Sequence, residues 1–453
     1  MILFQKNYME KRPNIILITI DALRSDHLGF MGYQKEVSPN IDVLSKESTV
    51  FTRAFATGPS TPHSFPGILT STYPLDYQGS EKMEKPRVLI SEVLKKQGYI
   101  TAAFHSNPYL SDYFGYNQGW DFFEDITFSG DMEEALENRK GNLIQKKFLA
   151  KVFGELTFIP FYELFFRAAY WLYKRISPRS NYKVKAAAIN QLARDFISYV
   201  KEEKKPIFIW IHYMDVHGPY LSLESYYQDK PPSYLEFISR CIVSFSSYFQ
   251  KKPSRKFLKN YSKKIIDLYD QSIKYVDQQL GKLLEFFKKE NVYQNSIICL
   301  TSDHGDEFWE HGGTAHNPKL YNELLQVPLL MKIPELKNRI IEKKVSLIDL
   351  SSTLCDLVKV GKPATFKGKN LFDSSTFPIF HQVKISSKQY KIGCQSNNWK
   401  YILDFSNGKE ELYNLSKDPK EKNNLSKSEP KILSQMKERI KEFEKENPPF
   451  SIG

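Results

Sequence analysis

The chain of 453 residues carries a formal net charge of +12 at pH 7, and 41% of its residues are hydrophobic. This content is ample for a sizeable core, and the length allows one large α/β domain with an addition, or two to three domains. The positive charge favours an anionic partner: a sulfated or phosphorylated substrate, an acidic membrane surface or a nucleic acid. Because the sequence contains no nucleic-acid-binding module, nucleic acid is not expected as a partner.

The cysteines and the N-terminal residues bear on the compartment. Cys241, Cys299, Cys355 and Cys394 are scattered without a CxxC pair, a pattern that does not indicate a disulfide framework and favours a reducing compartment. Residues 1–14 lack the long apolar core of a signal peptide. The sequence therefore predicts a cytoplasmic protein.

Apolar runs that end in polar residues predict the strands of one sheet. They are NIILITID (14–21), the end of 88–107, PIFIWIHYMDVHGPY (206–220) and SIICLTSDHGDE (296–307). Helical stretches separate them, which is typical of an α/β fold with a mostly parallel central sheet covered by helices on both faces. The polar groups all follow strands, and ligands of such sheets gather at the carboxyl ends of the strands.

Two insertions and a change in the sequence pattern near residue 370 define the expected domains. Residues 1–370 form the predicted catalytic α/β domain, with insertions at about 120–205 and 221–265. Short strand-like pieces and a final charged helix in 371–453 predict a smaller α+β C-terminal subdomain.

The stretch GPSTPHSFPGILTS (58–71) predicts a helix that begins after a turn rich in proline and hydroxyl groups. Ser60 or Thr61 is a candidate helix cap, because such side chains satisfy free N–H groups at a helix start. One of these hydroxyls is also a candidate nucleophile. A hydroxyl is a poor nucleophile by itself, so this role requires a base or a metal ion.

The segment 148–176 is very aromatic, but charges such as Lys151, Glu155, Glu163 and Arg167 interrupt it. A membrane-spanning helix needs about 20 nearly uncharged residues, so a spanning helix is not predicted. Two alternatives remain open: helices that lie on a membrane surface, and a buried helical insertion.

Two strand ends offer ligands for one divalent metal ion. Asp21 ends the first strand, and Asp303 and His304 follow the strand of 296–307. Carboxylate and imidazole groups together suit a hard divalent ion. The next acids, Asp306 and Glu307, are predicted to lie in the first turn of a following helix, where they would favour its dipole.

Further histidines follow strands. The segment HYMDVHGPY contains His212 and His217, and EHGGTAHNPK contains His311, His316 and Lys319. Cationic or hydrogen-bonding side chains in such positions can bind a transferring oxyanion and protonate a leaving alkoxide.

Taken in order, these segments resemble the sulfatase family of the alkaline-phosphatase superfamily. The other matching segments are SPNIDVLSKESTVFTRAFA, LYNELLQVPLL and the C-terminal NWKYILDFSNGKEELYNLSKDPKEKNNL. The resemblance implies that Asp21, Asp303 and His304 are metal ligands. It also implies that His217, with either His316 or Lys319, contacts the oxyanion or the leaving group, and His212, His311 and Ser60 are further candidates for substrate binding.

The opening stretch departs from the arylsulfatase pattern, in which a Cys or Ser is followed two residues later by Pro and four residues later by Arg. Ser60 has the correct spacing to Pro62, but Ser64 stands where the pattern has Arg. Counting back from ILTS places the nucleophile at Thr61. The stretch then resembles the threonine-bearing branch, which includes phosphoglycerol transferases and archaeal and bacterial sulfatase-like proteins. Threonine is not a substrate for formylglycine formation, so no formylglycine is expected.

The resemblance predicts one divalent ion (Mn, Zn or Ca), bound by Asp21, Thr61, Asp303 and His304. The expected activity is hydrolysis of a sulfate or phosphate ester by Thr61, with His217 and His316 as the other catalytic residues. A phosphodiesterase or a phosphoglycerol-type transferase acting on a lipid or glycan is an alternative. A further alternative is an inactive sulfatase-fold protein that binds anionic glycans or lipids.

Overall fold

The computed structural model describes residues 12–77, 79, 82–126, 162–176, 184–228, 232–244, 254–386 and 389–449. The part of the aromatic segment from 148 to 161 therefore lies outside the described residues, as does about half of the first expected insertion.

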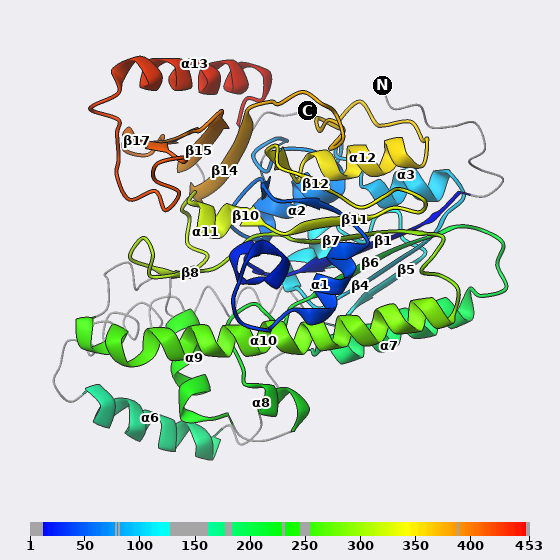
Figure 1. The fold of residues 1–453 in the computed structure, drawn as a ribbon, viewed down its shortest axis with the longest axis horizontal. Coiled ribbons are helices and arrows are strands. Elements are labelled where there is room, and N and C mark those ends of the chain that lie inside the picture. Colours follow the sequence, from blue (N-terminus) through cyan, green and yellow to red (C-terminus); the bar gives the residue numbers. More distant parts are fainter. Residues whose placement is uncertain are drawn as a thin grey trace.

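A central sheet of eight strands organises the molecule (Figure 1), in the order β12-β2-β11-β7-β1-β6-β4-β5. β7, β1, β6, β4 and β5 run parallel, whereas β11 is antiparallel to both of its neighbours. Their bounds are β1 (Asn14–Ile20), β2 (Thr49–Phe51), β4 (Ile100–His105), β5 (Phe122–Asp125), β6 (Ile207–Tyr213), β7 (Ser296–Ser302), β11 (Leu329–Lys332) and β12 (Arg339–Ile341). The predicted mostly parallel sheet is confirmed.

Helices cover both faces of this sheet, because the side chains of each central strand alternate between two hydrophobic cores. In β1, Ile16 and Ile18 enter one core, and Ile15 and Leu17 enter the other. The first core includes side chains of α1 (Pro39–Lys46), α7 (Ala186–Tyr199) and α10 (Arg255–Lys289), and the second includes side chains of α2 (Thr61–Thr70), α3 (Ile90–Lys96) and α12 (Asp349–Leu357). Figure 1 shows the two helical layers below and above the sheet.

Shorter elements complete the described chain. Small sheets are formed by β3 (Ala54–Phe55), β10 (Gln326–Val327) and β13 (Val345–Ser346), and by β8 (Glu307–Phe308) with β9 (Thr314–Ala315). The remaining helices before the C-terminal part are α6 (Tyr162–Ile176), α8 (Leu223–Tyr227), α9 (Tyr234–Ser244) and α11 (Asn322–Leu325), with 3-10 turns η1 (Ser25–His27), η2 (Gly29–Met31), η3 (Pro108–Leu110) and η4 (Asp112–Phe114).

A second, antiparallel sheet lies beside the first (Figure 1). It consists of β14 (Ile379–Ser386), β15 (Gln389–Ser396), β16 (Trp399–Asp404) and β17 (Lys409–Asn414), and α13 (Pro430–Glu446) packs on it. A buried ion pair joins Lys400 of β16 to Glu421 at 2.6 Å, and Glu421 also accepts from the backbone N of Asn322. The C-terminal sheet is thereby tied to the first residue of α11.

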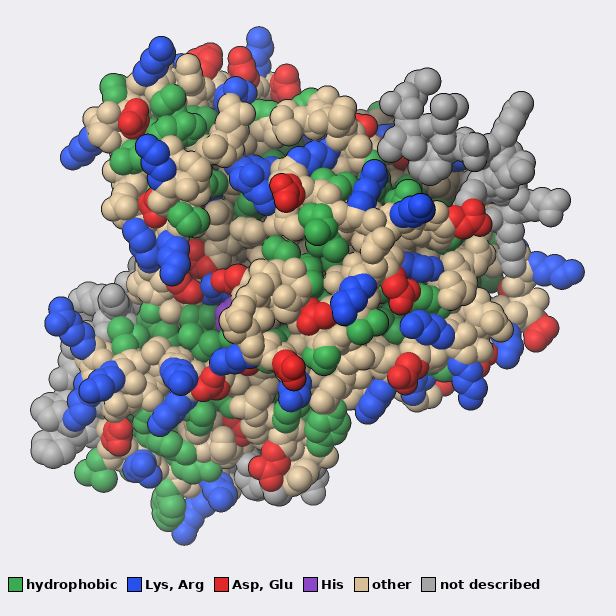
Figure 2. Space-filling model, viewed as in Figure 1, with side chains coloured by type: hydrophobic (Ala, Val, Ile, Leu, Met, Phe, Trp, Pro, Cys, Tyr) green, Lys and Arg blue, Asp and Glu red, His purple; other side chains and the backbone are tan. Residues whose placement is uncertain are grey.

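The structure describes all four cysteines and residues 162–176 of the aromatic segment. All four cysteines are buried and free. α6 packs one side on α9, where Tyr170 and Tyr173 contact Phe237. Its other side is exposed, and Figure 2 shows hydrophobic and basic side chains gathered at the lower left, where Figure 1 places this helix. Among the helices of the described residues, none combines the length and hydropathy that crossing a bilayer requires.

Candidate metal centre

Three neighbouring strands bring their carboxyl ends to one buried point. Asp21 follows β1, His212 lies near the end of β6, and Asp303 and His304 follow β7. β7, β1 and β6 are adjacent in the sheet, and all four side chains are fully buried. The structure therefore brings together polar groups that are far apart in the sequence.

The turn after β1 holds Asp21 in place. Ala22 has a φ of +58°, a left-handed conformation that costs energy for any residue other than glycine. The turn is fixed by the Tyr269 hydroxyl of α10, which donates to the Ala22 carbonyl and accepts from the Arg24 N–H, both at 2.8 Å. Asp303 Oδ1 also accepts from the Ala22 N–H at 3.3 Å.

α2 brings a hydroxyl to the same point from another direction. Thr61 is the first residue of α2, and Pro62 fits the first turn because its missing N–H is not needed there. Thr61 Oγ1 donates to Asp303 Oδ2 at 2.9 Å and lies 3.4 Å from Asp21 Oδ2. The neighbouring Ser60 Oγ instead lies 2.7 Å from His63 Nδ1. Of the two candidate hydroxyls, Thr61 is the one that contacts the acidic groups.

The ligand set fits a divalent cation. Ligand atoms of Asp21, Asp303 and His304 all lie within 4.8 Å of one another. Asp21 Oδ1 and His304 Nε2 are buried and have no hydrogen-bond partner, and such orphaned polar atoms are costly unless something binds them. His304, Asp306 and His316 also have ligand atoms this close, but Asp306 and His316 bond to each other.

The pKa values of the two carboxyl groups also support a bound divalent cation. Burial and the negative charge of Asp21 raise the pKa of Asp303 to about 7. Burial also acts to raise the pKa of Asp21, but His217, His212 and His304 outweigh it and hold that pKa well below its usual range. Two buried carboxylates this close disfavour a second negative charge, and a divalent cation would remove that penalty.

His212 lies in the wall of the cluster. Its Nδ1 lies 2.8 Å from Thr19 Oγ1, and its Nε2 lies 3.4 Å from Asp21 Oδ2. Phe65 of α2 packs edge-on against the ring. These contacts fix the ring beside Asp21.

Two histidines border the cluster where it becomes accessible. The His316 ring lies 4.5 Å from His304 and 4.9 Å from His217, and the His316 side chain is 24% exposed. Asp306 Oδ1 lies 2.9 Å from His316 Nδ1, and Asp306 Oδ2 accepts from the Tyr220 hydroxyl. Burial lowers the pKa of His316, but the hydrogen bond and charge of Asp306 outweigh it, so the pKa is raised.

The remaining candidates are held by other groups. His311 is bonded through Nδ1 to Glu323 and through Nε2 to the Glu421 carbonyl, and its ring stacks on Tyr321. Lys319 pairs with Glu307 at 2.6 Å. The structure thus engages His311 and Lys319 with the surrounding loop and the C-terminal segment, and none of their described contacts is with Asp21, Thr61 or Asp303.

The prediction that Asp306 and Glu307 begin a helix is wrong. Glu307 begins β8, and its carboxylate accepts from the backbone N–H groups of His311 and Gly313. The physical reason is local. The Glu307 carboxylate accepts hydrogen bonds from the turn between β8 and β9, and these bonds stabilise a hairpin where a helix was expected.

Asn107 is a further polar neighbour of this cluster that none of the sequence motifs indicates. It follows β4, caps η3, and is buried. Its Nδ2 donates to Asp21 Oδ2 at 2.8 Å and to Thr61 Oγ1 at 3.3 Å. The available signal was its place just after a predicted parallel strand, the same signal that identified Asp21.

Family models match nearly all of this chain. The model described as Sulfatase matches residues 13–360, and the model described as N-sulphoglucosamine sulphohydrolase, C-terminal, matches residues 310–446. The arylsulfatase K of Canis lupus familiaris is 24% identical over 95% of this chain and 82% of its own length. The arylsulfatase of Clostridium perfringens is 24% identical over 95% of this chain and 92% of its own length.

Solved structures share the fold. A protein in complex with its substrate D-glucosamine-2-N,6-O-disulfate has a TM-score of 0.70 at 16% identity, covering 98% of this chain and 100% of that chain. The phosphonate monoester hydrolase of Agrobacterium radiobacter has a TM-score of 0.66 at 18% identity, covering 95% of each chain. At these identities the likeness shows the fold alone.

Proposed function

Because this chain belongs to the sulfatase family, we propose that it is a metal-dependent ester hydrolase in which Thr61 Oγ1 attacks a sulfate or phosphate ester. The observation that carries this proposal is the position of Thr61: its hydroxyl lies at the start of α2 and contacts both Asp303 and Asp21. Ser60, which has the spacing of the arylsulfatase pattern, is engaged with His63 instead.

Asp21, Asp303 and His304, together with Thr61, would hold the cation. A bound divalent ion supplies positive charge that favours an ionised hydroxyl and offsets the charge of the transferring group. The buried and unpartnered atoms of Asp21 and His304 support this assignment.

The residues of the chain supply the other parts of the reaction. The positive end of the α2 dipole favours negative charge at Thr61. After the Thr61 hydroxyl has lost its proton to water, Oγ1 forms a bond to sulfur or phosphorus while the bond to the leaving oxygen breaks, and His316 donates a proton to that oxygen. Asp306 orients the His316 ring through Nδ1, which leaves Nε2 for the substrate. Water then attacks the sulfur or phosphorus and gives a proton to His316 while the bond to Thr61 Oγ1 breaks, so that sulfate or phosphate leaves and Thr61 is restored.

The identity of the nucleophile favours phosphate esters as a second candidate substrate class. A formylglycine can release sulfate by elimination through its second hydroxyl, and threonine has no second hydroxyl. An ester formed on Thr61 must instead be hydrolysed by attack at sulfur or phosphorus. A phosphodiesterase or a phosphoglycerol-type transferase follows the same path, with a hydroxyl acceptor in place of water for the transferase.

The test compares Thr61→Ala with Ser60→Ala, a matched loss of one hydroxyl from the adjacent position. Metal-loaded proteins are assayed with an aryl sulfate, a bis-aryl phosphate and a phosphonate monoester. Thr61→Ala is expected to abolish turnover, and Ser60→Ala is expected to retain it. The opposite pattern refutes the assignment, and mass spectrometry of the peptide containing residue 60 would reveal oxidation of Ser60 to formylglycine.

We also propose that α6 rests on an anionic membrane surface. Leu164, Phe165, Trp171 and Leu172 are 70%, 41%, 56% and 53% exposed, and their spacing places them on one face of the helix. Arg175 covers Trp171 at 3.7 Å, and Arg167 and Lys174 are exposed beside this face. An apolar stripe bordered by cations suits the interface of anionic lipids.

Flotation with vesicles tests this surface. Leu164→Gln/Leu172→Gln is expected to reduce binding to vesicles that contain phosphatidylserine. Ile340→Gln is the matched control, because Ile340 is 67% exposed on β12. Equal binding by the parent and the double variant, or to neutral and anionic vesicles, contradicts the proposal.

A further inference from the structure

The C-terminal sheet contacts the segment that leads into α2. β14 is an edge strand of that sheet, so one of its edges faces away from β15. From β14 the Gln382 N–H donates to the Thr57 carbonyl at 2.8 Å, and His381 Nδ1 donates to the Ala56 carbonyl at 2.7 Å. The segment before α2 is thereby held by a strand that lies 325 residues later in the sequence.

His63, in the first turn of α2, makes a third contact with β14. The Lys384 N–H donates to His63 Nε2 at 3.1 Å, and His63 Nδ1 lies 2.7 Å from Ser60 Oγ. A backbone N–H is always a donor, so Nε2 is the acceptor and the ring carries its proton on Nδ1. A serine hydroxyl this close to a histidine is typical of a nucleophile and its base. Here Nδ1 donates to Ser60 Oγ instead, so His63 is not a base for Ser60.

The packing around His63 leaves no room for an added atom. A Cβ atom at Gly58 would lie 2.3 Å from His63 Cβ and 2.7 Å from the Gln382 carbonyl oxygen. Thr57 Oγ1 donates to the His63 carbonyl at 2.9 Å, and Ser64 Oγ donates to the Gly58 carbonyl at 2.8 Å. The segment before α2, the first turn of α2 and β14 therefore form one closely packed unit.

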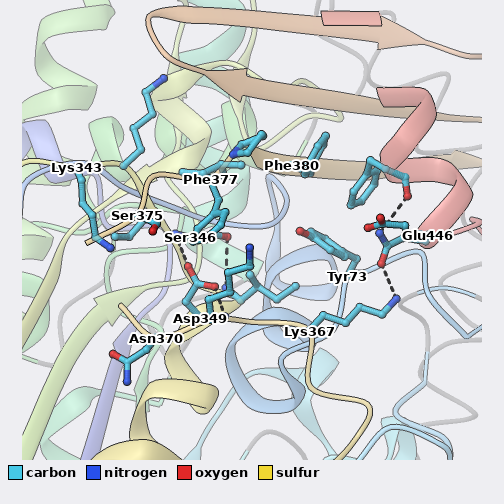
Figure 3. Close-up of a pocket in the computed structure, with 18 residues that line it drawn as sticks. Tyr73, Lys343, Ser346, Asp349, Lys367, Asn370, Ser375, Phe377, Phe380 and Glu446 are labelled. Atoms are coloured by element: carbon cyan, nitrogen blue, oxygen red, sulfur yellow. Dashed lines mark hydrogen bonds between the residues drawn. The ribbon is translucent and has the colours of Figure 1, made fainter. Parts of the chain in front are cut away.

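The other end of α2 is also fixed to the C-terminal part. The N–H of Leu75 donates to Gln382 Oε1 at 3.1 Å. Tyr73 packs edge-on against Phe443 of α13, with 4.7 Å between the ring centroids, and Phe443 stacks on Phe380 of β14. Tyr73 and Phe380 line the same pocket between these elements (Figure 3). The contacts with β14 and α13 therefore hold α2 at both of its ends.

We infer that His63 is a positioning residue, through which β14 of the C-terminal sheet sets the position of the Thr61 hydroxyl. His63 lies two residues after Thr61 in the same helical turn, so a shift of its ring moves the start of α2. Misplacing a reacting group by 1 Å can cost about 100-fold in rate. The inference rests on the proposed function, because it takes Thr61 as the nucleophile.

Three substitutions of His63 separate the two hydrogen bonds of its ring. In His63→Gln the side-chain oxygen takes the place of Nε2 and can accept from the Lys384 N–H. In His63→Asn the side-chain nitrogen takes the place of Nδ1 and can donate to Ser60, and His63→Ala loses both bonds. We expect kcat to fall about 10- to 100-fold in His63→Ala and His63→Asn with little change in KM, and His63→Gln to retain most of the parental kcat.

Tyr321→Phe is the matched control. It removes one hydrogen bond that joins the C-terminal sheet to the chain before α11, from the Tyr321 hydroxyl to Glu411 of β17 at 2.8 Å. None of the described hydrogen bonds of Tyr321 reaches residues 56–63. This variant is expected to have a lower thermal stability and the parental kcat.

Hydrogen exchange of the peptide that contains residues 56–65 gives a second measurement, which does not depend on turnover. Exchange in this peptide is expected to be faster in His63→Ala and His63→Asn than in the parent, and to be parental in His63→Gln and Tyr321→Phe.

Parental kcat in His63→Ala overturns the inference, and so does kcat that is retained in His63→Asn but lost in His63→Gln. An equal fall of kcat in His63→Ala and Tyr321→Phe overturns it as well, because any loosening of the C-terminal sheet would then have the same effect. If Thr61→Ala retains turnover, the proposed function fails. The hydrogen-exchange comparison then still shows whether β14 holds the start of α2 through His63.

Discussion

Replacing Asn107 tests how the buried cluster is positioned. Its Nδ2 donates to Asp21 Oδ2 at 2.8 Å and to Thr61 Oγ1 at 3.3 Å, while its Oδ1 accepts from the Tyr109 N–H at 2.9 Å. Asn107→Ala removes all three contacts. Asn107→Asp keeps an oxygen for Tyr109 but loses the donor to Asp21 and Thr61, so the pair of variants separates the two roles.

The magnitude follows from the bond to Asp21. A hydrogen bond to a charged group contributes about 1.5–3 kcal/mol, and this range corresponds to about a 10- to 150-fold loss in kcat/KM if the bond is needed in the transition state. We expect a loss in this range for Asn107→Ala. We expect a larger loss for Asn107→Asp, because it places a third carboxylate beside Asp21 and Asp303.

The assay is kcat/KM at saturating metal with the best ester of the panel, together with thermal unfolding of each variant. If the amide positions Asp21 and Thr61, both variants lose activity. If Asn107→Asp has the activity of the parent and Asn107→Ala does not, the residue serves only the η3 turn and the reasoning is refuted. Parental activity in both variants refutes it as well.

Three other predictions test the leaving-group acid, the C-terminal contact and the metal site. His316→Gln is expected to slow hydrolysis of an alkyl ester about 10²- to 10⁴-fold and to affect a nitrophenyl ester much less, because a good leaving group needs no proton; equal effects on the two esters contradict this role. Lys400→Met is expected to destabilise the fold by about 3–5 kcal/mol in urea denaturation, because it leaves buried Glu421 unpaired, and Lys400→Met/Glu421→Gln is expected to recover part of this loss. Removal of metal by a chelator is expected to lower the stability of the parent by about 3 kcal/mol if the ion is present at 100 times its Kd, whereas Asp303→Asn is expected to respond little to the chelator in thermal unfolding.

The sequence alone predicts the elements whose structure follows from the pattern of apolar residues. Continuous apolar runs predicted buried parallel strands, and the rule that polar groups gather at their carboxyl ends placed Asp21 near Asp303 and His304. Apolar periodicity does not distinguish Thr61 from Ser60. The two adjacent hydroxyls differ only in the direction that the first turn of α2 gives them. The register of the motif favours Thr61, which is the hydroxyl that contacts Asp303 and Asp21.

Other features depend on contacts that no local pattern encodes. Asp306 has the spacing of a helix-start acid, but Tyr220 and His316 approach it from two other segments. His311 stands in a histidine-rich loop, yet its partners are Glu323 and the carbonyl of Glu421, the latter 110 residues away. Asn107 joins Asp21 across 86 residues. Such partners are set by tertiary packing, so single-sequence reasoning does not reach them.

Glu421 holds His311 and the start of α11, two parts of the chain that are synthesised before it. A ribosome makes His311 and Asn322 before it makes Glu421, whose carbonyl contacts His311 and whose carboxylate accepts from the backbone N–H of Asn322. Chains generally fold in the order of synthesis, but His311 can meet the Glu421 carbonyl only after 110 further residues have been made. A nascent chain released before Glu421 is made would therefore contain every proposed metal ligand but lack the contacts that Glu421 makes with His311 and Asn322.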